Sequence, residues 1–174
     1  DLGDGRLFDR IVYSYDVASG IADGWLSPVK ARLAAAQIDV SGVARRGGEF
    51  VAGDLERAAN TDDLVEAACD EIVAIGASRR SWLCVCSGVQ HAEHVALALK
   101  KRGIEAAMIC GETPTAERDR LISAFKAGTL RALTNANVLT TGFDAPAVDL
   151  IALLRPTLSA GLYVQMIGRG TRKA

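Results

Sequence analysis

Apolar stretches of strand length alternate with helix-length amphipathic stretches from residue 54 onward, and this alternation limits the possible folds more than any other feature. Mostly apolar strands separated by helices indicate a parallel sheet that helices cover on both faces. We therefore predict an α/β domain with three layers and a central parallel sheet. The expected strands are SWLCVC (81–86), IEAAMIC (104–110), LRALTN (130–135) and VDLIALL (148–154).

Helix start signals precede the amphipathic stretches. Thr61 stands at the N-cap of a helix expected over residues 61–76, and acidic residues follow in its first turn. In SGVQ, the spacing of Ser87 and Gln90 predicts a capping box for the next helix. Further helices are expected to start at Pro114, where proline is tolerated as a first helical residue, and at about residue 159. The predicted buried face of the first helix consists of Leu64, Ala68, Ile72 and Ile75.

Residues 1–54 lack this regular alternation and are expected to form a connecting arm, whereas residues 55–174 form the domain. Within the arm, RIVYSYDV (10–17) predicts a short strand, ADGWLSP (22–28) a turn, and SGVARRGGEF (41–50) a loop. The chain starts with Asp rather than Met and ends without a closing element. We therefore expect it to be a piece of a longer protein.

Composition excludes some modes of binding. The net charge is -1 and the pI is about 6.2, so any phosphate must be bound by local, shaped sites rather than by a broad basic surface. No stretch has the length of a membrane-spanning helix, and no signal peptide is visible. The cysteines lack zinc-site spacing and are expected to be buried reduced thiols, which fits the cytosol: Cys69, Cys84, Cys86 and Cys110.

The stretch QMIGRGTR (165–172) places two arginines close together. On a helix, Gln165, Arg169 and Arg172 would share one face. Like charges on one face repel, and no acidic residue is near in sequence. The alternatives are a distant carboxylate partner, a bound anion, or arginines that are simply solvated.

The stretch NANVLTTGFDAP (135–146) follows an expected strand. It places Gly142 and Asp144 on a tight loop, with Pro146 stiffening the exit. An ordinary turn is the alternative. In parallel sheets, ligands bind at the carboxyl ends of the strands, so the loops at this edge are the candidate functional site. They follow Cys86, Cys110, Asn135 and Leu154.

Residues 80–172 resemble the second RecA-like domain of superfamily 2 helicases and translocases. CVCSGVQHAEHVALAL is similar to helicase motif IV, LTNANVLTTGFDAP to motif V and QMIGRGTR to motif VI. GETPTAERDRLISAFKAG is similar to the segment between motifs IV and V. The arm's DGWLSP resembles a DG-x-L-x-P stretch found in bacterial relatives of restriction-enzyme motor subunits and DNA repair helicases.

The resemblance implies a nucleotide site for ATP with Mg²⁺. Arg169 and Arg172 would act on the nucleotide phosphates as arginine fingers, in a cleft between two RecA-like domains. Gln165, Gly168, Gly142 and Asp144 would also bind the nucleotide or couple it to the nucleic-acid site. The Mg²⁺ ligands are expected in a first RecA-like domain that precedes Asp1.

The resemblance also implies that the chain binds the phosphate backbone of DNA, or of RNA. Such contacts do not depend on base identity. Ala136 stands where many relatives carry a threonine, and this puts one such contact in doubt. The implied contact residues are Ser87, Gly111, Asn137, Thr140 and Thr141.

A phosphate-binding loop and an acidic pair for Mg²⁺ are missing from the sequence. GVARRGGE has Gly48 where such a loop needs lysine, and DEIV (70–73) lies inside an expected helix. The chain alone is therefore predicted to be inactive towards ATP.

Rival functions remain. A cysteine-dependent phosphatase or sulfurtransferase would use Cys86, but Ala92 stands where its phosphate-binding arginine is expected. An α/β regulatory module that binds a nucleotide without turnover would explain the arginines, but not the other motifs.

Overall fold

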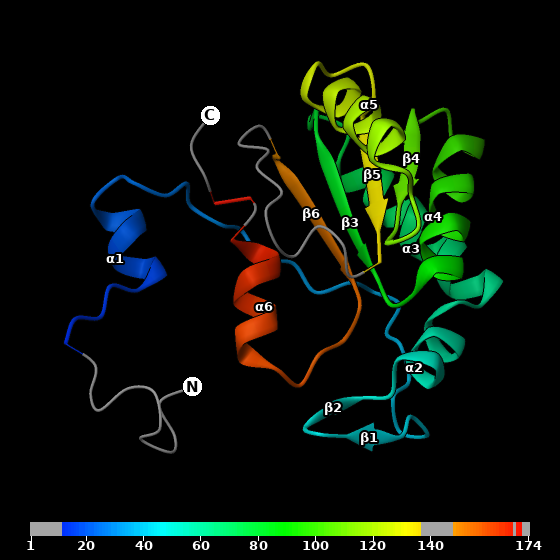
Figure 1. Cartoon of the computed structure of the whole chain (residues 1–174), viewed down its shortest axis with the longest axis horizontal. Helices are drawn as coiled ribbons and strands as arrows, with labels where there is room; N and C mark the ends of the chain where they lie inside the picture. Colours follow the sequence, from blue (N-terminus) through cyan, green and yellow to red (C-terminus); the bar gives the residue numbers. More distant parts are fainter. Residues whose placement is uncertain (1–11, 137–147, 169, 172–174) are drawn as a thin grey trace.

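The computed structural model describes residues 12–136, 148–168 and 170–171, and these form a parallel sheet with helices on both faces (Figure 1). The sheet has the strand order β4-β5-β3-β6, and all neighbouring strands are parallel. The three-layer α/β fold predicted from the sequence is therefore confirmed. The strands are β3 (Trp82–Cys86), β4 (Ala106–Ile109), β5 (Ala132–Asn135) and β6 (Leu150–Leu154).

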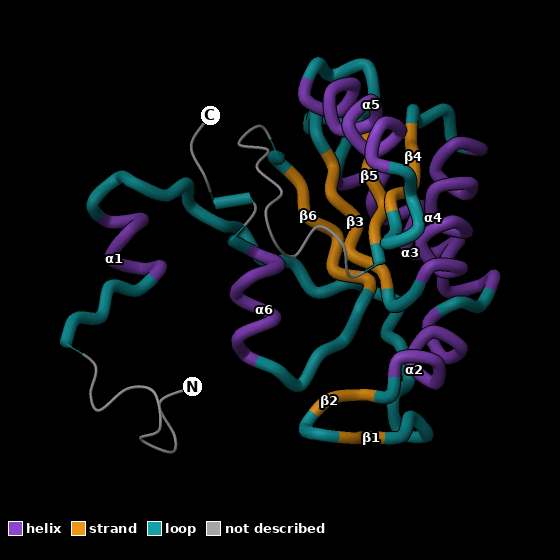
Figure 2. Tube along the Cα trace, in the orientation of Figure 1, coloured by secondary structure: helices purple, strands orange, loops and turns teal. Residues whose placement is uncertain are grey.

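The helices that cover the sheet lie in two layers, which Figure 2 shows on either side of the strands. One core contains α3 and α4 residues, such as Cys69 and Leu99, packed against Trp82 and Cys84. The other contains α5 and α6 residues packed against Leu83. Because alternate residues of a strand point to opposite faces, every residue of β3 is buried. The helices are α3 (Asp62–Ile75), α4 (Val89–Lys101), α5 (Thr115–Lys126) and α6 (Ala160–Ile167).

The buried face of α3 differs from the prediction by one position. The helix buries Val65, Cys69 and Ile72, while Ile75 is 37% exposed. Two apolar stripes lie side by side on this helix and share Ile72, so the sequence pattern does not separate them. Packing against α4 selects the stripe with Cys69, whose thiol donates to the backbone carbonyl of Val95 at 3.9 Å.

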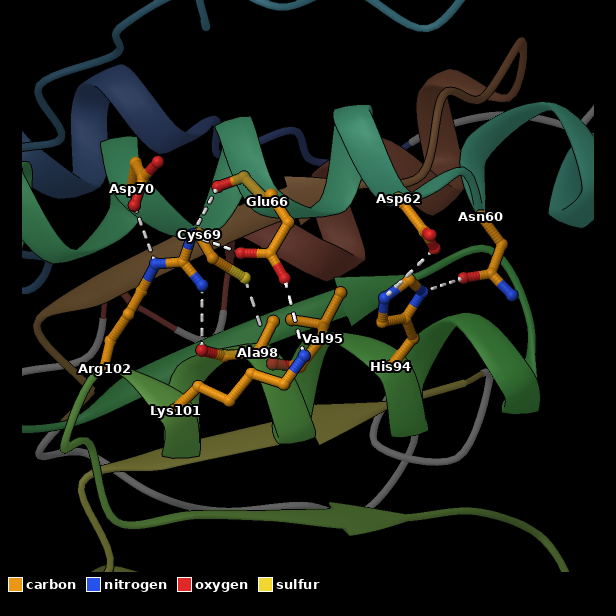
Figure 3. Close-up of polar contacts among 10 residues, drawn as sticks. All are labelled: Asn60, Asp62, Glu66, Cys69, Asp70, His94, Val95, Ala98, Lys101 and Arg102. Atoms are coloured by element: carbon orange, nitrogen blue, oxygen red, sulfur yellow. Dashed lines mark hydrogen bonds and ion pairs between the residues drawn. The ribbon is translucent and has the colours of Figure 1, made fainter.

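Polar contacts also join α3 to α4 (Figure 3). The Arg102 guanidinium donates to Asp70 at 2.7 Å and to Glu66 at 2.6 Å. The hydrogen bond with Asp70 raises the pKa of Arg102 above its ordinary value. Farther along the interface, the Nε2 atom of His94 lies 3.7 Å from an Asp62 side-chain oxygen, while its Nδ1 atom lies 2.9 Å from the side-chain oxygen of Asn60, the C-cap of α2. These contacts hold the two helices together on the outer side of the sheet.

The arm differs most from the predictions. Residues 12–16 form no strand, and α1 (Val17–Ala22) follows, capped by the Asp16 side chain; the rest of the predicted strand lies outside the described residues. The turn at ADGWLSP is confirmed, with Gly24 at a φ of 77°. The predicted loop contains a β-hairpin instead, β1 (Arg45–Arg46) and β2 (Glu49–Phe50).

Two glycines explain the hairpin. Gly47 and Gly48 have φ values of 60° and 80° between β1 and β2. A two-residue hairpin turn with positive φ at both positions matches the twist of the strands and favours glycine. Helix α2 (Ala52–Ala59) follows the hairpin directly. None of the helices in the described part of the chain is long and apolar enough to cross a membrane.

Candidate functional site

The carboxyl ends of the strands define the candidate site. Because the strands are parallel, the loops after β3, β4, β5 and β6 leave the sheet at the same edge, as predicted. Part of the predicted site lies outside the described residues and stays a prediction: Asn137, Thr140, Thr141, Gly142, Asp144, Arg169 and Arg172. The predicted site residues that the structure does describe are Ser87, Gly111, Gln165 and Gly168.

Ser87 lies at the end of β3 and is buried, with 2% of its surface exposed. Its hydroxyl donates to the backbone carbonyl of Leu154 at 3.0 Å and so joins the ends of β3 and β6. The predicted capping box is wrong, because the N-cap of α4 is Gly88 and the Ser87 hydroxyl is already used. Gln90 is exposed.

A carboxylate from α2 takes the place of the predicted cap. Glu56 Oε1 accepts a hydrogen bond from the backbone N–H of His91 at 3.0 Å, at the N-terminus of α4. A Cβ atom on Gly88 would lie 2.1 Å from the Glu56 side chain, so only glycine allows this approach. Negative charge is favourable at a helix N-terminus. Glu56 was not among the predicted residues, because no local spacing links it to α4.

His91 supports the same loop from inside. Its Nδ1 atom accepts a hydrogen bond from the backbone N–H of Ser87 at 3.3 Å. Burial, and to a smaller extent the nearby His94, lower the pKa of His91 from its ordinary value of 6.5 to about 4. His91 is therefore neutral at pH 7, which leaves this nitrogen free to accept.

The loop between β4 and α5 is held by Arg118. Its guanidinium donates to the backbone carbonyl oxygens of Cys110 at 3.1 Å and Thr113 at 3.3 Å. The Thr113 hydroxyl accepts from the Cys110 backbone N–H at 3.0 Å. Gly111 is exposed between these anchors. The next helix begins at Thr115, so Pro114 is its N-cap rather than its first residue.

The loop after β5 begins at Ala136, which is buried in the core formed with α3 and α4. A methyl group provides no hydroxyl, so this position cannot offer the side-chain contact that a threonine would. The rest of this loop, residues 137–147, lies outside the described residues.

The segment around the two arginines is not helical throughout. Helix α6 ends at Ile167 and Gly168 is its C-cap, so of Gln165, Arg169 and Arg172 only Gln165 lies within this helix, and the two arginines lie outside the described residues. Gln165 is exposed on α6, and Gly168 is half-buried. Glycine at positions 168 and 170 favours the end of the helix here.

The cysteine-based rival loses its nucleophile. Cys86 is fully buried, and burial raises the pKa of its thiol well above its usual range. A thiol in this state forms no thiolate at neutral pH. DEIV, the candidate acidic pair, lies within α3, as predicted. In the described part of the chain, no cluster of His, Cys, Asp and Glu is placed to hold a metal ion.

Comparisons with known proteins agree with the fold. The helicase conserved C-terminal domain model matches residues 63–174. IRC3 of Saccharomyces cerevisiae, described as a putative ATP-dependent helicase, is 31% identical over 168 residues, covering 95% of this chain and 24% of that protein. The chain spans about a quarter of the length of the first curated relatives.

Solved structures give the same architecture. The C-terminal domain of the DEAD-box protein Dbp5 aligns with a TM-score of 0.51 at 29% identity, covering 61% of this chain and 66% of that chain. S. cerevisiae Dbp5 bound to RNA and ADP BeF3 aligns with a TM-score of 0.52 at 29% identity, covering 60% and 29%. The fold shared by these proteins is the RecA-like fold that the sequence predicts.

Proposed function

Because the chain belongs to the helicase conserved C-terminal domain family, we propose that it acts as the second RecA-like domain of an ATP-dependent helicase or translocase. The family match over residues 63–174 carries this proposal, because it includes the whole sheet and the arginine-bearing segment. We assign residues 55–174 to the domain and residues 1–54 to an arm that connects it to a first RecA-like domain.

The proposed nucleotide role belongs to the end of α6 and the loop after β5. Arg169 and Arg172 would place positive charge against the phosphates of ATP, where charge develops during phosphoryl transfer. Carboxylates of the first domain would hold Mg²⁺, which would supply further positive charge to the same phosphates. The remaining proposed nucleotide contacts are Gln165, Gly168, Gly142 and Asp144.

The proposed nucleic-acid role uses the other loops of the same edge. Gly111 is exposed on a loop that Arg118 fixes, so its backbone N–H can meet a strand phosphate. Ser87 can contribute its hydroxyl only if it leaves the Leu154 carbonyl. The relative Dbp5 is described as bound to RNA. We propose DNA as the strand here, together with contacts from Asn137, Thr140 and Thr141.

The test of this function is ATP turnover by the parent protein with Arg169→Ala or Arg172→Ala. Losses of about a thousandfold or more are expected, because an arginine that stabilises the transferring phosphoryl group is removed. Arg79→Ala is the matched control, because Arg79 is an exposed arginine just before β3, at the opposite edge of the sheet. Unchanged turnover in both site variants would contradict the proposal.

Binding assays with single-stranded DNA and RNA of the same length test the strand. We expect binding that weakens as salt rises, since it rests on phosphate contacts. DNA is expected to bind at least as tightly as RNA. A clear preference for RNA would overturn the choice of strand and leave the ATP-dependent role intact.

A further inference from the structure

The backbone between the two arginines is tightly held. The N–H of Gly170 donates to the backbone carbonyl of Ile167 at 3.0 Å. A Cβ atom on Gly170 would lie 2.9 Å from the Ile151 side chain, so this backbone packs directly on β6. Thr171 is buried, with 3% of its surface exposed, and its hydroxyl donates to the Gly168 carbonyl at 3.1 Å.

One further contact comes from the arm. The backbone N–H of Ser27 donates to the backbone carbonyl of Thr171 at 2.7 Å. Thr171 directly precedes Arg172 and comes two residues after Arg169. Figure 1 shows the arm after α1 passing beside the end of α6. The turn in DGWLSP is therefore bonded to the segment that carries both arginines.

The turn is a built unit rather than a loose strand. The backbone N–H groups of Trp25 and Leu26 both donate to the Gly20 carbonyl at 2.9 Å. The Leu26 side chain packs on Gly20, where an added Cβ atom would lie 2.8 Å away. Gly24, at a φ of 77°, allows the chain to reverse. These contacts fix the direction of the Ser27 N–H.

We propose that the turn at residues 24–27 is a positioning element for Arg169 and Arg172, acting through the Ser27 N–H. This inference rests on the proposed role of the two arginines in ATP turnover. The turn lies outside residues 63–174, which match the family, so it adds to that domain from the arm. A backbone shift of about 1 Å at a positioning segment can lower the rate of the chemical step about a hundredfold.

The test is Ser27→Pro in the parent protein, compared with Ser27→Ala. Proline removes the N–H, and its fixed φ suits this site because Ser27 precedes Pro28 and is expected to be extended. Alanine keeps the N–H. We expect kcat for nucleic-acid-stimulated ATP turnover to fall about tenfold to a hundredfold in Ser27→Pro, with KM for ATP little changed. Ser27→Ala should keep the kcat of the unaltered protein.

Equal kcat values for the two variants would overturn the inference, and so would a loss that appears only in KM. Hydrogen exchange at the Ser27 amide of the unaltered protein gives a second test that needs no variant. Slow exchange is expected, and exchange as fast as that of a free amide would contradict the contact. Arg172→Ala in the same assay separates the two claims. If it abolishes turnover while Ser27→Pro does not, only the positioning role fails.

Discussion

The two tryptophans show how differently the sheet body and the arm are built. Trp82, the first residue of β3, is fully buried, and the Arg131 guanidinium lies 4.4 Å from the centroid of its ring. Its indole N–H donates to the Arg79 carbonyl at 3.2 Å. Trp25 in the arm is 73% exposed. The same residue type is therefore a core residue in the body and a surface residue in the arm.

The comparison explains where sequence patterns succeed. In the body, strands and helices supply each other with apolar partners, so periodicity predicts both type and place. At the end of the arm, Val43 and Phe50 pack on Leu55 of α2. In residues 12–39, apolar side chains stay largely exposed, as those of Val12, Tyr13 and Leu33 do. No hydrophobic core imposes a period on these exposed residues, and the predicted strand at RIVYSYDV does not form in residues 12–16.

The largest expected effect compares these two residues directly. Trp82→Ala should lower the free energy of unfolding by about 3–5 kcal/mol, because it empties a large volume in the core. Trp25→Ala should change it by less than about 0.5 kcal/mol, as surface substitutions do. Urea unfolding of both variants, followed by circular dichroism, measures the difference. Equal losses would mean that the arm packs as firmly as the body.

Acid should weaken the body through His91. Between pH 6.5 and about 4 the unfolded chain binds a proton at this residue that the folded chain does not. Stability should therefore be complete above pH 6.5 and decline as the pH falls towards 4, by up to about 3 kcal/mol. His91→Gln should show a smaller decline in urea unfolding at pH 7.5 and pH 5. A variant with the same pH dependence as the unaltered chain would remove His91 as the cause.

A smaller effect tests α2, which joins the arm to the body. Gly88→Ala places a Cβ atom against the Glu56 carboxylate, which must then swing away and give up its hydrogen bond with the His91 N–H, so the variant should lose about 0.5–2 kcal/mol. Gly53→Ala on α2 meets no atom within 4 Å and should be neutral or stabilise by up to about 1 kcal/mol. Thermal unfolding distinguishes them. If both variants melt alike, the contact between Glu56 and Gly88 is not formed in solution.

Part of the site was predictable and part was not, for reasons that particular residues show. The parallel order of the strands follows from the alternation of elements, and it places the predicted loops at one edge. Ser87 was predicted as a helix cap, but its hydroxyl donates instead to the backbone carbonyl of Leu154, which is 67 residues away in the sequence. Glu56 reaches α4 from 35 residues away. Contacts between distant segments leave no local spacing to detect.

The segment with the arginines is also held by contacts from residues that are distant in the sequence. Its helical spacing suggested one face for Gln165, Arg169 and Arg172, but α6 ends at Ile167. The packing of Gly170 on β6 and the bond from Ser27 to Thr171 fix this segment instead. Both depend on residues that come together only in the folded chain.

ATP hydrolysis by the 174-residue chain alone tests the central claim most directly. In the proposed function, this chain carries only the arginine side of a nucleotide site that two domains share, and half a site leaves the reacting groups unpositioned. We predict no detectable hydrolysis by the chain alone, and nucleic-acid-stimulated hydrolysis when the parent's first domain is joined to it. Hydrolysis by the isolated chain that disappears in Arg172→Ala would contradict the account, because the catalytic parts would then all lie within these residues.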